Sequence, residues 1–355
     1  MHCCWQLARQ PVKVIVDTSK NPGIMREPEG FLPNSLALGY ALTAQIIGLF
    51  LITRSSTAAI APGILLTAHS MVIASYLIHE CAHMTLFRAQ AVNRRVGELM
   101  AWISGASYAS FERIRHFHIR HHRDRADVAR FNYKDFLRAR SPVLLRLVYA
   151  LEWAYIPAIE LIMHAQVMLR PFIDPRVRQE RRRVLVMLAS RVTLFALLFT
   201  IQPLSLLWFA VAYLLFVSVM SFFDAFHHTF EQYYIDDDEA PLPMQGKDRV
   251  YEQANTYSNL VSVHHPWLNY LTLNFNYHNA HHERASTPWY RLPALHRQLY
   301  GAENRQLITF TELLRTFHRN RLRRILDDDY GSVSEGANRA DQFVGAHGVS
   351  LLTVV

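Results

Sequence analysis

Eight histidines in this sequence fall into three groups whose spacing could aim their side chains at a shared site. Within each group the spacing is three or four residues, which places side chains on one face of an α-helix. The groups are "HECAH", "HIRHH" and "HNAHH", which contain His79 and His83; His118, His121 and His122; and His278, His281 and His282. Imidazole is a suitable ligand for Zn, Cu, Fe and Ni. Since a zinc ion takes about four ligands, eight nitrogens are too many for one metal and suit two.

Three long uncharged stretches indicate that these groups sit on a membrane protein. Of the 355 residues, 51% are hydrophobic and 19% are charged, but the apolar residues are unevenly distributed. No charged residue occurs in residues 31–53, 55–78 or 192–223. Each stretch exceeds the roughly 20 residues that a helix needs to cross a bilayer. We expect an all-α integral membrane protein with about four transmembrane helices in two hairpins, the second of which spans residues 184–226.

The distribution of arginines predicts the side of the membrane on which the histidines lie. The link between the first two helices contains only Arg54, whereas residues 88–140 are densely basic. By the positive-inside rule the basic stretch is cytoplasmic, and it accounts for the net charge of +8 without a nucleic-acid partner. All three histidine groups then share the cytoplasmic side, where they can form one site in a helical cap.

The composition along the chain also predicts its organisation. We expect a cytoplasmic N-terminal segment (1–34), a membrane domain (35–300), a cytoplasmic helical extension (301–330) and a disordered tail rich in Gly, Ser and Ala (331–355). Two apolar stretches that contain charges, residues 96–111 and 143–169, are more typical of interfacial helices than of spans. The second is long enough that a fifth span stays open. Three cysteines, two of them adjacent, predict no disulfide framework.

Taken together, the three groups resemble the histidine boxes of the membrane fatty-acid desaturase superfamily, which also contains hydroxylases. The stretch "HHERASTPWYRLPALH" after the third group is similar to that family as well, and the resemblance covers roughly residues 35–300. The resemblance implies two membrane hairpins below a cytoplasmic cap that holds two irons. It makes all eight histidines of the three groups iron ligands. A further ligand precedes the third box in many members, within a His-Thr pair that matches His228 and Thr229 here.

The choice of His228 over its neighbour His227 also follows from helix geometry. Adjacent residues on a helix point about 100° apart, so at most one of the two should face the metals. Asp224 lies four residues before His228, and we expect its carboxylate to orient that imidazole. Other candidates for this outer role are Glu80, Asp124 and Glu283. The remaining histidines lack ligand spacing and are interpreted as non-ligands: His69, His164, His264, His265, His296, His318 and His347, with His116 left open.

The resemblance implies an O₂-dependent enzyme that removes hydrogen from a fatty-acyl chain. A saturated C–H bond offers no acid or base handle, so a cofactor must supply this chemistry. Desaturation is the first expectation, while hydroxylation, or decarboxylation of a free fatty acid to a terminal alkene, stays open. The sequence has no GxGxxG motif and no cysteine cluster. Electrons must then come from an external donor such as a ferredoxin, a cytochrome b5-like protein or a reductase. The other partners expected are the lipid bilayer and the acyl substrate.

Two other classes of protein remain as alternatives. His79, Glu80 and His83 match H-E-x-x-H, in which two histidines bind zinc and the glutamate acts as general base of a metalloprotease. An intramembrane zinc protease would leave the other two groups without a role, so it is a remote alternative. A metal carrier without catalytic chemistry is the other. Metal content separates these classes, since the oxygenase predicts iron, the protease one zinc, and the carrier variable loading.

Overall fold

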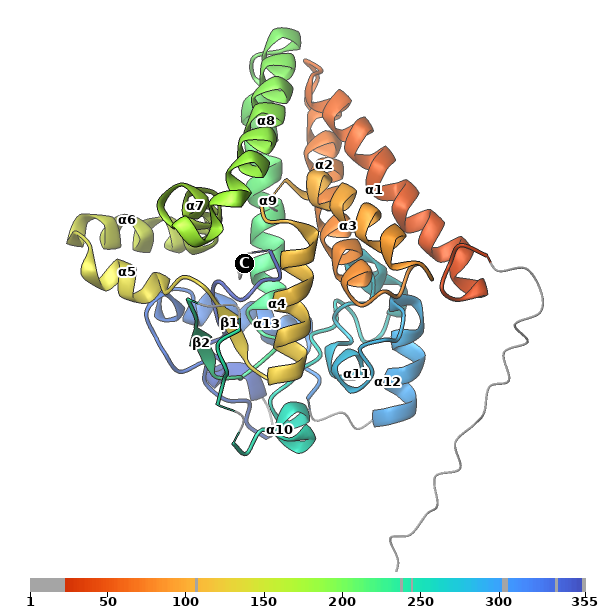
Figure 1. Ribbon diagram of the computed structural model, residues 1–355, viewed down its shortest axis with the longest axis vertical. Helices are drawn as coiled ribbons and strands as arrows, with labels where there is room; N and C mark the ends of the chain where they lie inside the picture. The colour runs from red at the N-terminus through yellow and green to blue at the C-terminus, as the bar shows by residue number, and fades with distance from the viewer. Residues whose placement is uncertain are drawn as a thin grey trace, which may run out of the picture.

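The structure is a computed structural model that describes residues 23–105, 108–236, 239–243, 245–301, 306–335 and 338–352. Most of the N-terminal segment 1–34 therefore lies outside the described residues. Within them nearly all regular structure is helical (Figure 1). Two short strands, β1 (Asp127–Ala129) and β2 (Gln232–Tyr234), pair in parallel with Val128 opposite Tyr233. This pairing ties the segment after the second histidine group to the segment after His228.

Four described helices are long and apolar enough to cross a membrane. They are α1 (Phe31–Ile52), α2 (Thr57–Ala82), α8 (Arg181–Ile201) and α9 (Ser205–Asp224). In Figure 1 the ends at which α1 is linked to α2 and α8 is linked to α9 lie at the top of the view, away from the remaining elements. Large apolar side chains such as Phe50 on α1 and Phe199 on α8 are more than half exposed. An apolar surface of this kind suits contact with lipid, so the number of long apolar helices expected from the sequence is confirmed.

The first two helices lie close together because glycines face the contact. A Cβ atom at Gly48 would lie 2.8 Å from the backbone nitrogen of Thr67 and also against its hydroxyl. A Cβ atom at Gly63 would lie 2.9 Å from the backbone nitrogen of Ile52. Small residues of this kind allow helix backbones to approach closely in membranes. The contact fixes α2, which carries the first histidine group.

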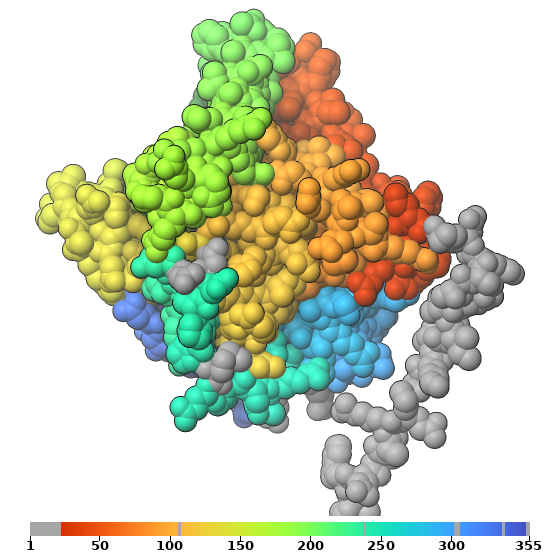
Figure 2. Space-filling view, viewed as in Figure 1, coloured from red at the N-terminus to blue at the C-terminus, as the bar shows by residue number. Residues whose placement is uncertain are grey.

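The remaining helices gather at the opposite end of the molecule. They are α3 (Gln90–Ser104), α4 (Phe111–Asp124), α5 (Tyr133–Ala139), α6 (Pro142–Trp153), α7 (Ala158–Ile173), α10 (Arg249–Ala254), α11 (His278–Glu283), α12 (Leu292–Tyr300) and α13 (Phe310–Asn320). Short 3₁₀ turns join several of them. Figure 2 shows α4 in yellow near the middle of one face, with α3 in orange on one side and the segment around β2 and α10 in teal on the other.

The stretch at residues 143–169 does not form a fifth span. It is divided between α6 and α7, and the chain turns at Tyr155, whose φ is 61°. Proline disfavours a helical conformation in the residue before it, which explains a break ahead of Pro157. Neither helix reaches the roughly 20 residues of a transmembrane helix. Residues 96–111 are likewise divided between α3 and α4.

The tail beyond Tyr330 was expected to be disordered, and for residues 331–335 and 338–352 that expectation is wrong. Phe343 and Val344 are fully buried. The backbone N–H of Ala346 donates to the carbonyl of Ala225 at the end of α9, and Arg324 donates to the carbonyl of Val344. The Gly- and Ser-rich composition concealed a few apolar anchors that pack against the end of α9.

The contact between α1 and α2 predicts the effect of adding one methyl group. Gly48→Ala should lower the free energy of unfolding by about 1–3 kcal/mol, because the new Cβ overlaps Thr67. Gly39→Ala is the matched control, since nothing lies within 4 Å of its Cβ position. Thermal unfolding of the two variants in detergent measures the difference. Equal midpoints for both variants would contradict the close packing.

Candidate metal centre

Four segments far apart in the sequence carry the candidate histidines to one place. α2 carries His79 in its last turn and His83 as its C-cap residue, and α4 presents the second group near its C-terminal end. The short helix α11 carries the third group. Hydrogen bonds from Asn279 to the carbonyl of Thr256 and from Ser258 to Asn279 hold α11 against the segment after α10. His228 follows the turn after α9 and pairs with Thr256 in an isolated β-bridge.

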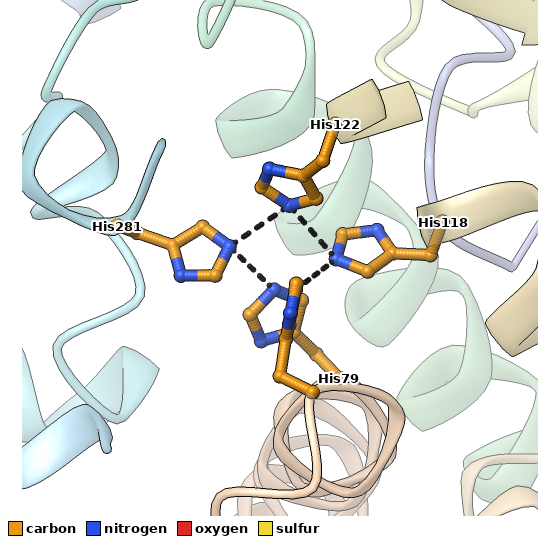
Figure 3. Close-up of side chains that lie close together, drawn as sticks. His79, His118, His122 and His281 are labelled. Atoms are coloured by element: carbon orange, nitrogen blue, oxygen red, sulfur yellow. Dashed lines mark hydrogen bonds between the residues drawn. The ribbon is translucent and has the colours of Figure 1, made fainter. Parts of the chain in front are cut away.

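Five of these histidines form what we call the first cluster: His79, His83, His118, His122 and His281. Their candidate ligand atoms all lie within 4.8 Å of one another. The Nε2 atoms of His79 and His281 are 3.1 Å apart, and those of His83 and His118 are 2.6 Å apart. Figure 3 shows four of these rings pointing toward a common centre from α2, α4 and α11: His79, His118, His122 and His281. A single small ion at that centre would contact several nitrogens at once.

The other four histidines form the second cluster: His121, His228, His278 and His282. The Nε2 atom of His228 lies 3.1 Å from that of His121 and 2.8 Å from that of His278. The two clusters adjoin each other, since the ring centroids of His122 and His282 are only 4.2 Å apart. All nine histidines predicted from the sequence are therefore brought together, in two adjacent groups.

The outer nitrogens of these rings show which nitrogen carries the proton. His121 Nδ1 lies 3.0 Å from the carbonyl oxygen of Ala126, which can only accept, so this nitrogen must donate. His282 Nδ1 lies 3.0 Å from the Glu252 carboxylate, and His79 Nδ1 lies 3.3 Å from Glu80. In a neutral imidazole a protonated Nδ1 leaves Nε2 with a lone pair. The lone pairs therefore point inward.

This arrangement fits bound metal ions. His228 Nδ1 faces the hydroxyl of Thr256, which itself donates to the carbonyl of Glu252 and so must accept from the imidazole. The Nε2 atoms of His228 and His121 are then both acceptors, yet they lie 3.1 Å apart. The buried Nε2 of His282 has no hydrogen-bond partner. Facing lone pairs of this kind are unfavourable unless a cation lies between them.

Burial keeps the imidazoles in the neutral form that binds metals. It lowers the pKa of His118, His122 and His281 well below the ordinary value, and neighbouring histidines add to the effect. The pKa of His228 and the pKa of His278 are lowered in the same way. Metal binding requires unprotonated nitrogen, so no proton has to be displaced near neutral pH.

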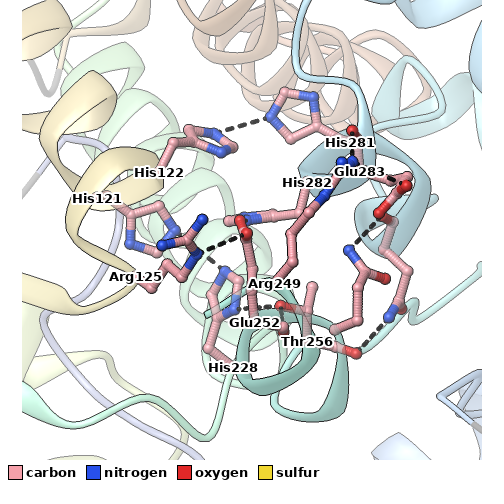
Figure 4. Close-up of polar contacts among 12 residues, drawn as sticks. His121, His122, Arg125, His228, Arg249, Glu252, Thr256, His281, His282 and Glu283 are labelled. Carbon is pink, nitrogen blue, oxygen red and sulfur yellow. Dashed lines mark hydrogen bonds and ion pairs between the residues drawn. The ribbon is translucent and has the colours of Figure 1, made fainter. Parts of the chain in front are cut away.

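Carboxylates surround the clusters without joining them, except where Glu252 approaches His282 and His122. Glu80 also accepts from the hydroxyl of Thr85 and the backbone N–H of Trp289. Asp127 lies 3.3 Å from His121 Nδ1. Figure 4 shows Glu252 between His282 and Arg125, whose guanidinium donates to it. Such outer carboxylates fix the ring orientation and offset the charge of a bound cation.

The expected partnership between Asp224 and His228 is wrong. Asp224 lies 3.7 Å from Nδ1 of His227 instead. The prediction assumed that the helix continues, but α9 ends at Asp224, so the four-residue spacing no longer places His228 on the same face. His227 lies outside both clusters, and its Nε2 contacts Asn259. Sequence reasoning missed three partners of the histidines: Asp127, Glu252 and Thr256. The last two come from a distant segment that has no motif.

Two other carboxylates that were candidates for orienting the imidazoles pair with arginines rather than with the histidines. Asp124 contacts Arg120 and Arg123, and Glu283 contacts Arg249. The histidines interpreted as non-ligands are absent from the clusters among the described residues. His69, for example, lies 2.5 Å from the Tyr40 hydroxyl and 3.0 Å from the carbonyl of Leu271.

Comparison with known families agrees with this geometry. The profile of one family, described as fatty acid desaturase, matches residues 55–313, well over half of the chain. The chain belongs to the fatty acid desaturase family. The match includes every histidine of both clusters, and the family implies an oxidoreductase. A search of curated proteins gives no significant match.

The two clusters predict different effects for the neighbouring histidines of this desaturase-family protein. His228→Ala should lower the metal content by roughly one ion per chain, because the second cluster loses a central nitrogen. His227→Ala, the matched control, should leave the metal content unchanged. Elemental analysis of both purified variants after iron loading measures this. Loss confined to His227→Ala would show that the wrong neighbour lies in the cluster.

Proposed function

We propose that this protein is an O₂-dependent diiron membrane enzyme that removes hydrogen from a fatty-acyl chain, with desaturation as its reaction. The observation that carries the proposal is the pair of adjacent nitrogen clusters, five histidines beside four, within a chain of the desaturase family. Two metal ions held in these adjacent clusters would supply chemistry with molecular oxygen. Imidazole ligands suit iron, and the family is one that uses it.

The protein residues supply binding, orientation and exclusion of water. Two irons with O₂ would supply the oxidant that a saturated C–H bond requires and that no side chain provides. The histidines would hold the ions, and Glu80, Asp127 and Glu252 would keep the ring nitrogens in the correct tautomer. Burial of the clusters limits the access of water, which would quench a reactive oxidant.

A cavity beside the clusters offers a place for an apolar chain. Its volume is about 60 Å³, and histidines of both clusters form part of its wall. The rest of the wall is largely apolar, with Phe117, Val128, Met220, Phe275, Val349 and Leu351. Contacts of this type favour a hydrocarbon over a polar substrate. The lining therefore supports an acyl chain with one carbon near the ions.

Hydroxylation and decarboxylation would begin with the same hydrogen abstraction and therefore need the same residues. A zinc protease using His79, Glu80 and His83 is disfavoured by the contacts of Glu80. Its carboxylate already accepts from Thr85 and from the backbone of Trp289, and it faces His79. A general base needs a free oxygen toward its substrate water.

The four long helices would span the membrane as two hairpins, with the clusters on the cytoplasmic side. The basic residues 88–140 support this orientation through the positive-inside rule. An external one-electron donor, such as a ferredoxin, a cytochrome b5-like protein or a reductase, would deliver electrons from that side.

The proposed activity predicts a change in cellular lipids. Cells that express the chain should contain an unsaturated acyl product. A terminal alkene or a hydroxy acid is expected instead if the reaction ends in decarboxylation or hydroxylation. His281→Ala should abolish the product, because it removes a nitrogen from the first cluster, while the exposed His264→Ala should retain it. Mass spectrometry of lipids and volatiles measures both. Wild-type product levels from His281→Ala would contradict the role of the clusters.

The proposed orientation predicts the location of reporter fusions. A reporter after residue 54 should be external, whereas reporters after residues 130 and 300 should be cytoplasmic. Enzymatic reporters with compartment-dependent activity distinguish the two sides. Opposite sides for residues 130 and 300 could not be reconciled with one shared site.

A further inference from the structure

A second group of ionisable side chains is buried near α9 and takes no part in the histidine clusters. It consists of Glu152 on α6, Glu160 on α7, Arg324 after α13 and His347 in the tail, all at most 7% exposed. Burying two carboxylates is costly unless they are paired, hydrogen-bonded or used. These side chains lie near the cavity beside the histidine clusters, which suggests that they serve the reaction there.

Close contacts connect the members of this group. The Glu160 carboxylate lies 3.5 Å from Nδ1 of His347, and the Glu152 carboxylate lies 3.9 Å from Nε2 of the same ring. The hydroxyl of Ser221 on α9 donates to Glu160 over 3.4 Å. His347 thus stands between the two glutamates, at distances that a small side-chain rotation or one water molecule would close.

Three neighbouring cavities along α9 lie between this group and the clusters. The cavity beside the histidines shares Met220 with a cavity of about 10 Å³ that Glu160 and Ser350 line. That cavity in turn shares Ser221 with one of about 70 Å³ that Glu152 and Arg324 line. A cavity of roughly 10–15 Å³ with polar walls can hold one water molecule. The third cavity reaches the half-exposed Tyr155, at the protein surface.

Asp224 is the inner end of this series. Its side chain lines the cavity beside the histidines and forms a hydrogen bond with Ser350, which lines the next cavity. Its Oδ2 atom is buried and has no hydrogen-bond partner. The Oε2 atom of Glu160 is likewise buried and has no hydrogen-bond partner. Two acceptors are thus left open along the route.

We propose that Glu152, His347, Glu160 and Asp224 form a relay that carries protons from the protein surface to the cavity beside the clusters. The need for it rests on the proposed function: a –CH₂–CH₂– unit, O₂, two electrons from the donor protein and two protons give –CH=CH– and two waters. The electrons come from the external donor, and the protons must come from solvent. The histidines of the clusters would be engaged in holding the ions and would not supply these protons.

A purely structural role does not explain why the buried side chains of this group are ionisable. Glu160 does hold the tail, since it accepts from the backbone N–H of Gly348, and Glu152 accepts from that of Ile159. Either bond could be made by an uncharged glutamine. Burial raises the pKa of Glu152, whereas burial of Glu160 is outweighed by its contacts with His347 and Gly348, which lower the pKa of that carboxyl. The two carboxylates therefore differ in their affinity for a proton.

The relay can be tested without any acyl substrate. Reducing buried metal ions adds negative charge in a medium of low dielectric constant, which favours uptake of a compensating proton. Iron-loaded protein in detergent is reduced chemically in weak buffer, and a pH-indicator dye records proton uptake. The variants are Glu160→Gln and Glu152→Gln, in which the amide oxygen can still accept from Gly348 or Ile159. Glu112→Gln, at an exposed position on α4, is the matched control.

The relay predicts that proton uptake in Glu160→Gln and Glu152→Gln is slower than in Glu112→Gln by on the order of tenfold or more, with equal iron content. Equal uptake rates in all three variants, or no uptake by the wild-type protein, would overturn the proposal. Loss of iron from both relay variants would do so as well, since it would assign the glutamates to holding the fold. Slowed uptake in a protein that makes no lipid product would uphold the relay and reject the proposed function instead.

Discussion

Imidazoles whose lone pairs face one another repel, and this protein gathers nine histidines in two adjoining clusters. The outer contacts leave little choice of tautomer. Ala126 accepts from His121, and Thr256 accepts from His228, so both inner nitrogens are acceptors at a separation of 3.1 Å. Cations between the rings turn this repulsion into attraction. The arrangement of the rest of the protein depends on meeting that requirement.

The fold meets it by bringing distant segments to the ends of two apolar helices. α2 delivers the first pair of histidines, and the turn after α9 delivers His228. The parallel pairing of β1 with β2 fixes the segment after α4 beside the segment after α9. The tail packs against the end of α9, where Val349 and Leu351 complete the wall of the cavity. The long apolar helices therefore support the clusters, and their exposed apolar side chains suit contact with lipid.

The features that could be predicted from the sequence are those that depend on short-range spacing. Long uncharged runs identified the four apolar helices, and spacings of three and four residues identified the histidines of α2, α4 and α11. Predictions that needed knowledge of where a helix ends were less successful. Asp224 is the last residue of α9, so its expected contact with His228 is replaced by one with His227.

Long-range partners were beyond prediction for a related reason. Glu252 contacts His282 across 30 residues and Arg125 across 127, and no local pattern marks it. The tail showed the opposite problem, because a Gly- and Ser-rich composition masked the buried Phe343. Composition describes the average of a segment, whereas a single aromatic anchor can decide whether that segment packs.

The central claim is that the two clusters hold two metal ions through histidine nitrogens. Iron K-edge X-ray absorption on the purified, iron-loaded protein, combined with elemental analysis of the same sample, tests it most directly. The account predicts about two irons per chain with a first shell dominated by nitrogen and a second iron as a neighbour. A single zinc that survives iron chelation, or isolated iron in an oxygen shell, would contradict it.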